Sequence, residues 1–333
     1  MFFLIISRTP FRMSFFGGGT DIEDFYAKHG GAVLSATFDK YCYVNIRHLP
    51  GFFEYNTHLT YSDTEYVDSY LDIKHPLIRN AMKYLDIRDL RLIYDADLPA
   101  RSGLGTSSSF AVGMLNAFYA LKGKCCDKKK LADEAIYIER VLCQEAGGVQ
   151  DQIAAAYGGL NKIEISDSGY KVSPVIMSNE RKKKLSDSLM LFFTGFTRFS
   201  ADVQKDVKKD IKNKEKQLLE MKKLVYDAEN ILSSGQDLND FGKLLNYTWE
   251  LKRGLSSGIS TDAIDDLYKK AIESGALGGK LLGAGGGGFL LFFVEPDKQK
   301  SFLKRFNPLL HVPFEFENDG SSIIYYQSED YVL

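Results

Sequence analysis

The segment from Pro99 to Phe110 combines two glycines, Gly103 and Gly105, with four consecutive hydroxyl-bearing residues, Thr106 to Ser109. The glycines let the backbone approach an anion that a Cβ would keep away. A helical pattern of apolar residues follows, and the unpaired N–H groups at a helix start attract phosphate together with the helix dipole. The hydroxyls can add donors or reach a metal ion. The segment therefore predicts a phosphate-binding loop.

Two better-known phosphate loops do not fit this segment. A Walker A loop ends in Gly-Lys-Ser/Thr, and no lysine follows Gly105. A dinucleotide fingerprint needs a third glycine where Ser108 stands. On local sequence alone, an ordinary serine-capped helix after a glycine turn explains the segment equally well, so the other motifs of the chain decide.

A second motif follows Arg12 and reads Gly17-Gly18-Gly19-Thr20-Asp21. Thr20 and Glu23 have the spacing of a capping box, which places Asp21 in the first turn of a short helix. Asp21 then either compensates the helix dipole or accepts hydrogen bonds from a polyol.

A third motif contains seven glycines between Gly278 and Gly288, within apolar strands. Glycines there cost backbone entropy and fill no core, so a close approach to another loop or to phosphates must require them. Two acids complete the set of candidate groups. Glu139 lies on a helix predicted over 131–143, and Asp151 lies near the start of a short helix predicted over 150–157.

Hydrophobic spacing predicts the elements that must position these groups. Strands are predicted at 1–6, 32–38, 41–46, 90–94, 160–165, 170–175 and 189–193, with 32–38 and 41–46 joined as a hairpin through Asp39-Lys40. Helices are predicted at 76–85, 110–121, 131–143, 150–157, 201–232 and 238–255, and one more helix and two strands between 302 and 326.

The composition bounds the class of protein. A chain of 333 residues predicts one large domain or two intimately packed ones. A net charge of −2 gives no electrostatic case for nucleic acid. The apolar start at 1–6 is too short for a signal peptide or a membrane span, and the four cysteines lack zinc-ligand spacing. We therefore expect a reduced, cytoplasmic protein without a nucleic-acid or membrane partner, as a monomer or homodimer.

The three glycine-bearing motifs, in this order, resemble those of the kinases named for galactokinase, homoserine kinase, mevalonate kinase and phosphomevalonate kinase (GHMP kinases). Segments 9–21, 99–109 and 280–288 carry the resemblance. It implies a two-lobed α+β fold, with an N-terminal lobe like domain 2 of ribosomal protein S5 over 1–180 and a ferredoxin-like C-terminal lobe over 181–333. ATP and Mg²⁺ are the implied cofactors.

The Gly-Gly-Gly-Thr-Asp variant, Gln150-Asp151-Gln152 and the segment 194–198 are most similar to the branch that phosphorylates D-glycero-D-manno-heptose 7-phosphate. The resemblance implies transfer of the γ-phosphate of ATP to the anomeric hydroxyl, giving heptose 1,7-bisphosphate for nucleotide-activated heptose and surface glycans. A fucose- or galactose-type sugar 1-kinase is the alternative. A non-catalytic sensor of sugar and nucleotide on the same fold is another, and a dinucleotide-binding oxidoreductase is a weaker one.

The resemblance also implies roles for individual residues. Asp151 is the base or orienting carboxylate, Arg12 stabilises charge on the transferred group, and Ser107 with Glu139 positions Mg²⁺. The implied ATP-binding residues are Pro99, Ser102, Gly103, Leu104, Gly105, Thr106, Ser107 and Ser108. The implied substrate-binding residues are Arg12, Gly18, Gly19, Thr20, Asp21, Asp151, Arg198, Gly285 and Gly286, with Arg198 expected to hold a remote sugar phosphate.

Overall fold

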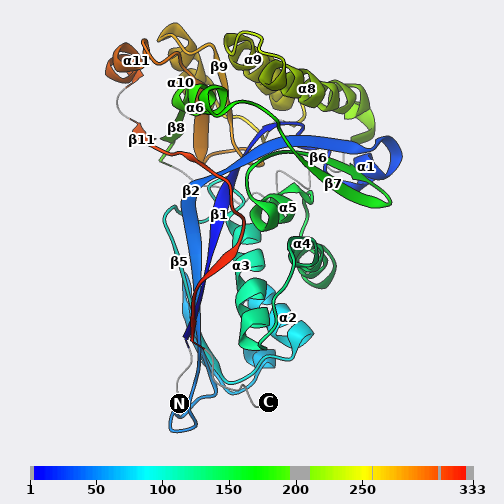
Figure 1. The fold of residues 1–333 in the computed structure, drawn as a ribbon, viewed down its shortest axis with the longest axis vertical. Helices are drawn as coiled ribbons and strands as arrows, with labels where there is room; N and C mark the ends of the chain where they lie inside the picture. Colours follow the sequence, from blue (N-terminus) through cyan, green and yellow to red (C-terminus); the bar gives the residue numbers. More distant parts are fainter. Residues whose placement is uncertain (1–3, 196–210, 257, 307–308, 328–333) are drawn as a thin grey trace.

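The computed structural model describes residues 4–195, 211–256, 258–306 and 309–327. Within these ranges the strands form one nine-stranded sheet and one four-stranded sheet. Helices cover each sheet, and the four-stranded sheet with its helices lies at the top of the molecule in Figure 1. This arrangement confirms the predicted α+β fold with two lobes.

The two longest strands, β1 (Leu4–Phe16) and β2 (Gly31–His48), form the centre of the large sheet. The predicted hairpin at Asp39-Lys40 is wrong, because β2 runs through these residues without turning. Pro10 pairs with Tyr41 while Phe11 pairs with Phe38, so the two polar residues form a bulge. The strand predicted at 1–6 likewise continues to Phe16, which puts the Arg12 motif inside a strand.

Strands from distant parts of the chain complete the large sheet. β5 (Leu90–Ala96) pairs with one half of β2 and β6 (Leu160–Ser166) with the other. Next to these lie β3 (Thr57–Thr60), β4 (Thr64–Val67) and β7 (Gly169–Pro174). The C-terminal strands β12 (Phe316–Glu317) and β13 (Ser322–Gln327) return to pair with β2 and β1. The lobe boundary at residue 180 stays a prediction, and the last strands join the first sheet.

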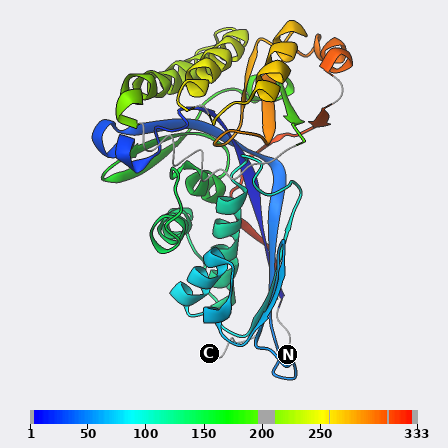
Figure 2. The same cartoon turned by 180° about the vertical axis from the view of Figure 1, so that it is seen from behind.

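Helices pack on one face of the large sheet, as Figure 2 shows from behind. They are a short helix η1 (Tyr70–Asp72), α2 (Pro76–Leu85), α3 (Thr106–Leu121), α4 (Lys128–Ile136) and α5 (Gln150–Tyr157). α1 (Glu23–His29) lies apart from this layer and buries Phe25 in the core of the small lobe. α4 begins earlier than predicted because the Asp127 side chain caps it, and it continues as a π-helical segment, η2 (Tyr137–Leu142). This last turn carries Glu139.

The small sheet has the strand order β11–β8–β10–β9. Its strands are β8 (Leu189–Phe193), β9 (Gly278–Leu281), β10 (Phe289–Phe293) and β11 (Leu310–Val312). The helical segments of this lobe are α6 (Asn179–Asp187), η3 (Ile211–Lys214), α8 (Glu215–Ser233), α9 (Asn239–Arg253), α10 (Asp262–Glu273) and α11 (Gln299–Phe306). The sequence analysis missed α6 and α10.

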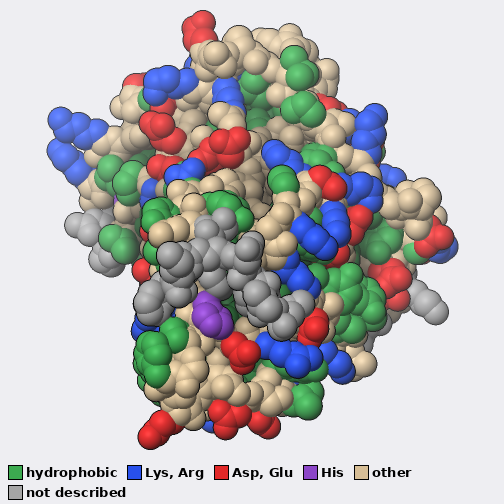
Figure 3. All heavy atoms as spheres, turned by 60° about the horizontal axis from the view of Figure 1, so that its bottom comes forward, with side chains coloured by type: hydrophobic (Ala, Val, Ile, Leu, Met, Phe, Trp, Pro, Cys, Tyr) green, Lys and Arg blue, Asp and Glu red, His purple; other side chains and the backbone are tan. Residues whose placement is uncertain are grey.

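On the face drawn in Figure 3, lysine and arginine side chains are interspersed with aspartate and glutamate. Among the described residues, no helix is both long and apolar enough to cross a membrane.

Candidate active site

The phosphate loop and the glycine-rich loop pack backbone against backbone. A Cβ built on Gly283 would lie 2.3 Å from the Cα of Gly103, and one on Gly288 would lie 2.2 Å from the carbonyl oxygen of Ser102. Real Cβ atoms do not approach backbone so closely, so glycine is required at both positions. This loop-to-loop contact is one of the two close approaches that the glycine content predicted, and it joins the start of α3 to the β9–β10 connection.

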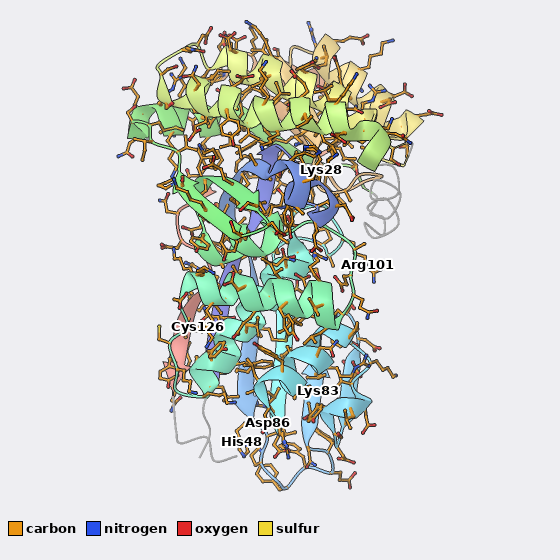
Figure 4. All side chains as sticks on the ribbon, turned by 90° about the vertical axis from the view of Figure 1, so that its right-hand side faces the viewer. Lys28, His48, Lys83, Asp86, Arg101 and Cys126 are labelled. Carbon is orange, nitrogen blue, oxygen red and sulfur yellow. The ribbon has the colours of Figure 1, made fainter. Side chains whose placement is uncertain are left out.

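A cleft lies where these two loops meet the turn at 17–21 and the start of α5. It encloses roughly 1130 Å³ of space, its open mouth included. Arg101, a lining residue, lies at one margin of the molecule in Figure 4, away from His48 and Asp86 at the far end. The remaining lining residues are Arg12, Ser14, Gly18, Gly19, Asp21, Ile22, Gly103, Gly105, Thr106, Ser107, Ser108, Arg140, Gly148, Gln150, Asp151, Lys252, Leu255, Ile259, Lys280, Gly283 and Ala284.

The start of α3 faces this cleft with its N–H groups. Gly105 is the N-cap residue and adopts a left-handed φ of +72°, which glycine takes without strain. Thr106, Ser107 and Ser108 form the first turn and line the cleft. The first N–H groups of a helix have no partner within the helix, so this end offers an anion both donors and a favourable dipole.

Arg12 and Asp151 form a two-pronged ion pair inside the cleft. Arg12 Nε lies 2.8 Å from Asp151 Oδ1, and Nη2 lies 2.8 Å from Oδ2. Arg12 Nη1 also donates to the carbonyl of Gly103 at 2.7 Å. Arg12 is 4% exposed. The pair therefore fixes the Asp151 carboxylate next to the phosphate loop, and planar bidentate contacts of this kind hold orientation as well as charge.

A second acid, Glu139, lies behind the phosphate loop. The Ser107 hydroxyl donates to Glu139 Oε1 at 3.0 Å, and Gln152 Nε2 donates to Oε2 at 2.6 Å. Glu139 is 1% exposed. Because Ser107 and Gln152 each donate to one of its carboxylate oxygens, both oxygens are held in a fixed orientation. Among the described residues, no three His, Cys, Asp or Glu side chains gather closely enough to hold a metal ion by themselves.

Asp21 lies at the opposite wall, and the predicted capping box is wrong. α1 begins after Ile22 without a side-chain cap, while the Thr20 hydroxyl bonds to the backbone of Gly17 and Ala32. The Asp21 carboxylate instead accepts N–H bonds from Gly19 at 3.0 Å and from Gln150 at 3.3 Å. Burial, and then the charge of Asp151, raise the pKa of Asp21.

Two buried lysines line the cleft, and the sequence analysis assigned neither to the site. Lys252 Nζ donates to the carbonyls of Leu281 at 3.0 Å and Gly283 at 2.5 Å, and Lys280 Nζ donates to that of Phe15 at 2.6 Å. Burial, and then the charge of Arg12, lower the pKa of Lys252 to about 7. Lys252 shares the apolar face of α9 with Trp249, and a lysine at such a position was the available signal.

The other predicted site residues differ in where they lie. Gly18, Gly19 and the α3 start line the cleft. Thr20, Ser102 and Leu104 are buried, and Gly285 and Gly286 pack against Ile259. Pro99 is exposed, in the loop that leads from β5 to α3. Arg198 lies outside the described residues.

Comparison with known proteins identifies the family of this chain. Residues 74–159 match the GHMP kinases N terminal domain, and residues 224–308 match the GHMP kinases C terminal domain. The chain is 32% identical over 313 residues to D-glycero-alpha-D-manno-heptose 7-phosphate kinase of Campylobacter jejuni, covering 90% of this chain and 92% of that protein.

Two further proteins are similar to this chain. The crystal structure of a D-glycero-D-manno-heptose 1-phosphate kinase from Bacteroides thetaiotaomicron superposes with a TM-score of 0.78 at 26% identity, covering 97% of this chain and 100% of that one. The L-fucokinase/L-fucose-1-P guanylyltransferase of Bacteroides fragilis is 31% identical over 212 residues, covering 61% of this chain and 22% of that protein. The chain belongs to the GHMP kinase family, whose members are ATP-dependent kinases.

Proposed function

We propose that this ATP-dependent carbohydrate kinase transfers the γ-phosphate of ATP to the anomeric hydroxyl of D-glycero-D-manno-heptose 7-phosphate. The product would be heptose 1,7-bisphosphate, for nucleotide-activated heptose and surface glycans. The observation that carries the proposal is the Asp151 carboxylate, held by Arg12 between the phosphate loop and the Asp21 turn. The identity to the C. jejuni protein over most of both chains supports this acceptor.

The chemistry needs one proton transfer and much charge neutralisation. As the anomeric oxygen attacks the γ-phosphorus, the bond to the β–γ bridging oxygen breaks and ADP leaves. Asp151 accepts the proton of the attacking hydroxyl. Arg12 neutralises charge on the transferred group, and the N–H groups at the α3 start hold the phosphate oxygens. Protein groups mainly position and neutralise, as phosphoryl transfer requires.

The residues behind the phosphate loop fit a magnesium ion. Mg²⁺ prefers oxygen ligands and is usually held by one or two protein groups together with phosphates and waters. Ser107 is exposed in the first turn of α3 and touches Glu139, whose second oxygen is fixed by Gln152. We assign Ser107 and Glu139 to hold the ion. When bound, it neutralises charge on the β- and γ-phosphates.

Substitutions of Ser107 or Glu139 are expected to weaken the binding of Mg²⁺ rather than the affinity for sugar. For Glu139→Gln we expect the Mg²⁺ concentration for half-maximal rate to rise about 10-fold or more, in the range seen when metal-site groups are removed. Ser107→Ala should shift it in the same direction. Rates are measured over a Mg²⁺ titration at saturating ATP and sugar, with Glu273→Gln on the exposed surface of α10 as the control. A higher sugar KM with an unchanged Mg²⁺ titration would contradict the assignment.

The acceptor is tested by product analysis with a panel of sugars. Heptose 7-phosphate, free heptose, fucose and galactose are each incubated with ATP and Mg²⁺, and NMR of the product gives the phosphorylated position. We expect heptose 7-phosphate to be the most efficient substrate, with phosphate added at the anomeric oxygen. Comparable efficiency with free heptose or fucose would favour the fucose-type alternative, which the Bacteroides fragilis relative supports. Absence of sugar-dependent ADP release would favour the non-catalytic sensor.

Binding of the phosphate group of heptose 7-phosphate should depend on Arg198. Because an arginine holds phosphate through charged hydrogen bonds, Arg198→Ala is expected to raise the KM for heptose 7-phosphate roughly 10- to 100-fold, or about 1.5–3 kcal/mol. ATP affinity should change little. An unchanged KM for heptose 7-phosphate in the purified variant would exclude Arg198 from phosphate binding.

A further inference from the structure

Two buried polar side-chain atoms in the cleft have no hydrogen-bond partner among the described residues. They are the Ser14 hydroxyl oxygen and Gln150 Oε1. Ser14 is 6% exposed and Gln150 is 8% exposed, and both residues line the cleft. Buried polar groups in folded proteins nearly always have partners, so an unpaired pair at one wall of a binding cleft points to a ligand.

Both side chains lie next to Gly18. A Cβ built on Gly18 would be 3.9 Å from Ser14 Oγ and 4.0 Å from Gln150 Nε2. Ser14 follows Arg12 by two residues on β1, and side chains two apart on a strand point to the same face. Ser14 therefore faces the cleft on the same side as the Arg12–Asp151 pair. The turn at Gly18 brings it close to Gln150, which begins α5.

The orientation of the Gln150 amide is set by Asp21. The backbone N–H of Gln150 and its side-chain amide both donate to the Asp21 carboxylate. An amide oxygen facing a carboxylate would be repelled, so the NH₂ end lies toward Asp21 and Oε1 lies elsewhere. Gln150 therefore keeps an unpaired acceptor at a residue that lines the cleft, while the Ser14 hydroxyl can both donate and accept.

Other unpaired buried atoms differ in their location. Thr248 Oγ1 and Trp249 Nε1 on α9, and Ser102 Oγ in the phosphate loop, belong to residues that do not line the cleft. Within the described part of the chain, Ser14 and Gln150 thus combine burial, an unpaired oxygen and a position on the cleft wall.

We propose that Ser14 and Gln150 form a hydroxyl-recognition subsite, which binds ring hydroxyls of the acceptor beside its reacting carbon and so selects among sugars. The subsite rests on the proposed function in needing a polyol acceptor. It adds two specificity residues to Asp21, whose carboxylate completes the set of acceptor oxygens along this wall. Such a site rejects an acceptor that lacks the matching hydroxyl, because the protein groups then stay unpaired.

The test removes one hydrogen-bonding group at a time from the protein and from the acceptor. Ser14→Ala and Gln150→Met are each expected to raise the acceptor KM about 10-fold, equivalent to 1.4 kcal/mol, with kcat and the KM for ATP within about twofold of wild type. Each variant and the wild type are then assayed with acceptor analogues that each lack one hydroxyl. For at least one analogue, the wild type should lose about 10-fold while Ser14→Ala or Gln150→Met loses nothing further.

A second variant and a control separate recognition from structure. Gly18→Ala adds a methyl group in ordinary contact with Ser14 and Gln150, so it should raise the acceptor KM while both polar groups remain. Thr248→Val removes an equally buried, unpaired hydroxyl outside the cleft and should leave the acceptor KM unchanged. Equal losses for every analogue in wild type and variants would overturn the subsite, as would a preferred acceptor without neighbouring hydroxyls.

The acceptor panel keeps this test apart from the proposed function. If wild type prefers a sugar other than heptose 7-phosphate, the proposed acceptor fails, and the analogues are built on the preferred sugar instead. The subsite then stands or falls on the same comparison between analogues and variants.

Discussion

Asp151→Asn is expected to lower kcat about 10²-fold or more, the range for loss of a positioned proton acceptor. Asparagine keeps one oxygen that can accept from Arg12 but cannot take the proton of the sugar hydroxyl. ATP should still bind, because the α3 start and the loop backbone remain in place. The effect should therefore appear in kcat, with the KM for ATP nearly unchanged.

This variant also leaves the Arg12 guanidinium less well neutralised inside the cleft. Breaking one partner of a buried ion pair destabilises proteins, so thermal unfolding must be measured with the kinetics to show that the variant is folded at the assay temperature. Asp265→Asn is the matched control. Asp265 also pairs with an arginine, Arg253, with 2.6 Å between Oδ2 and Nη2, and neither residue lines the cleft. The control should keep wild-type kcat. Near-wild-type turnover of Asp151→Asn would remove Asp151 from the mechanism.

The sequence analysis correctly predicted elements whose structure depends on residues close by in the sequence. α2 begins at Pro76 and ends at Leu85 as predicted, because its apolar spacing and first-turn proline suffice to define it. The Asp39-Lys40 pair is different. Polar residues between two apolar runs favour a turn, yet β1 is long enough to pair with both halves of β2, and Phe316 pairs with Phe38 beside the bulge. A partner that distant in sequence has no local signature.

The same distinction holds within the cleft. The resemblance to GHMP kinases implied that Arg12, Asp151 and the phosphate loop share one site, and the structure brings them together. It did not identify Ser14 or Lys252. Ser14 becomes informative only once residues 8–16 are known to be a strand, which places it on the face of Arg12. Lys252 reaches the cleft from α9, and only the packing of α9 against β9 brings it to Gly283.

Gly283→Ala is the second substitution for which we expect a large effect, because Gly283 packs against the backbone of the phosphate loop. A Cβ there would lie 2.3 Å from the Cα of Gly103, and the φ of +76° is left-handed. The conformation alone costs a non-glycine residue about 1–2 kcal/mol. The clash adds to this cost, because its partner is backbone that can yield only by moving the phosphate loop. Since Arg12 Nη1 bonds the Gly103 carbonyl, that movement would shift the Arg12–Asp151 pair as well.

We therefore expect kcat/KM for Gly283→Ala to fall by about 10² or more, because a displacement near 1 Å at a reacting centre can cost that much. Gly235→Ala is the matched control, with a φ of +80° and no atom within 4 Å of the added Cβ. It carries the conformational strain without the clash, so it should lower the thermal midpoint slightly and leave kcat/KM unchanged. Steady-state rates and thermal unfolding of both variants check the prediction. Equal effects in the two variants would show that strain alone, and not the contact between the loops, accounts for the loss.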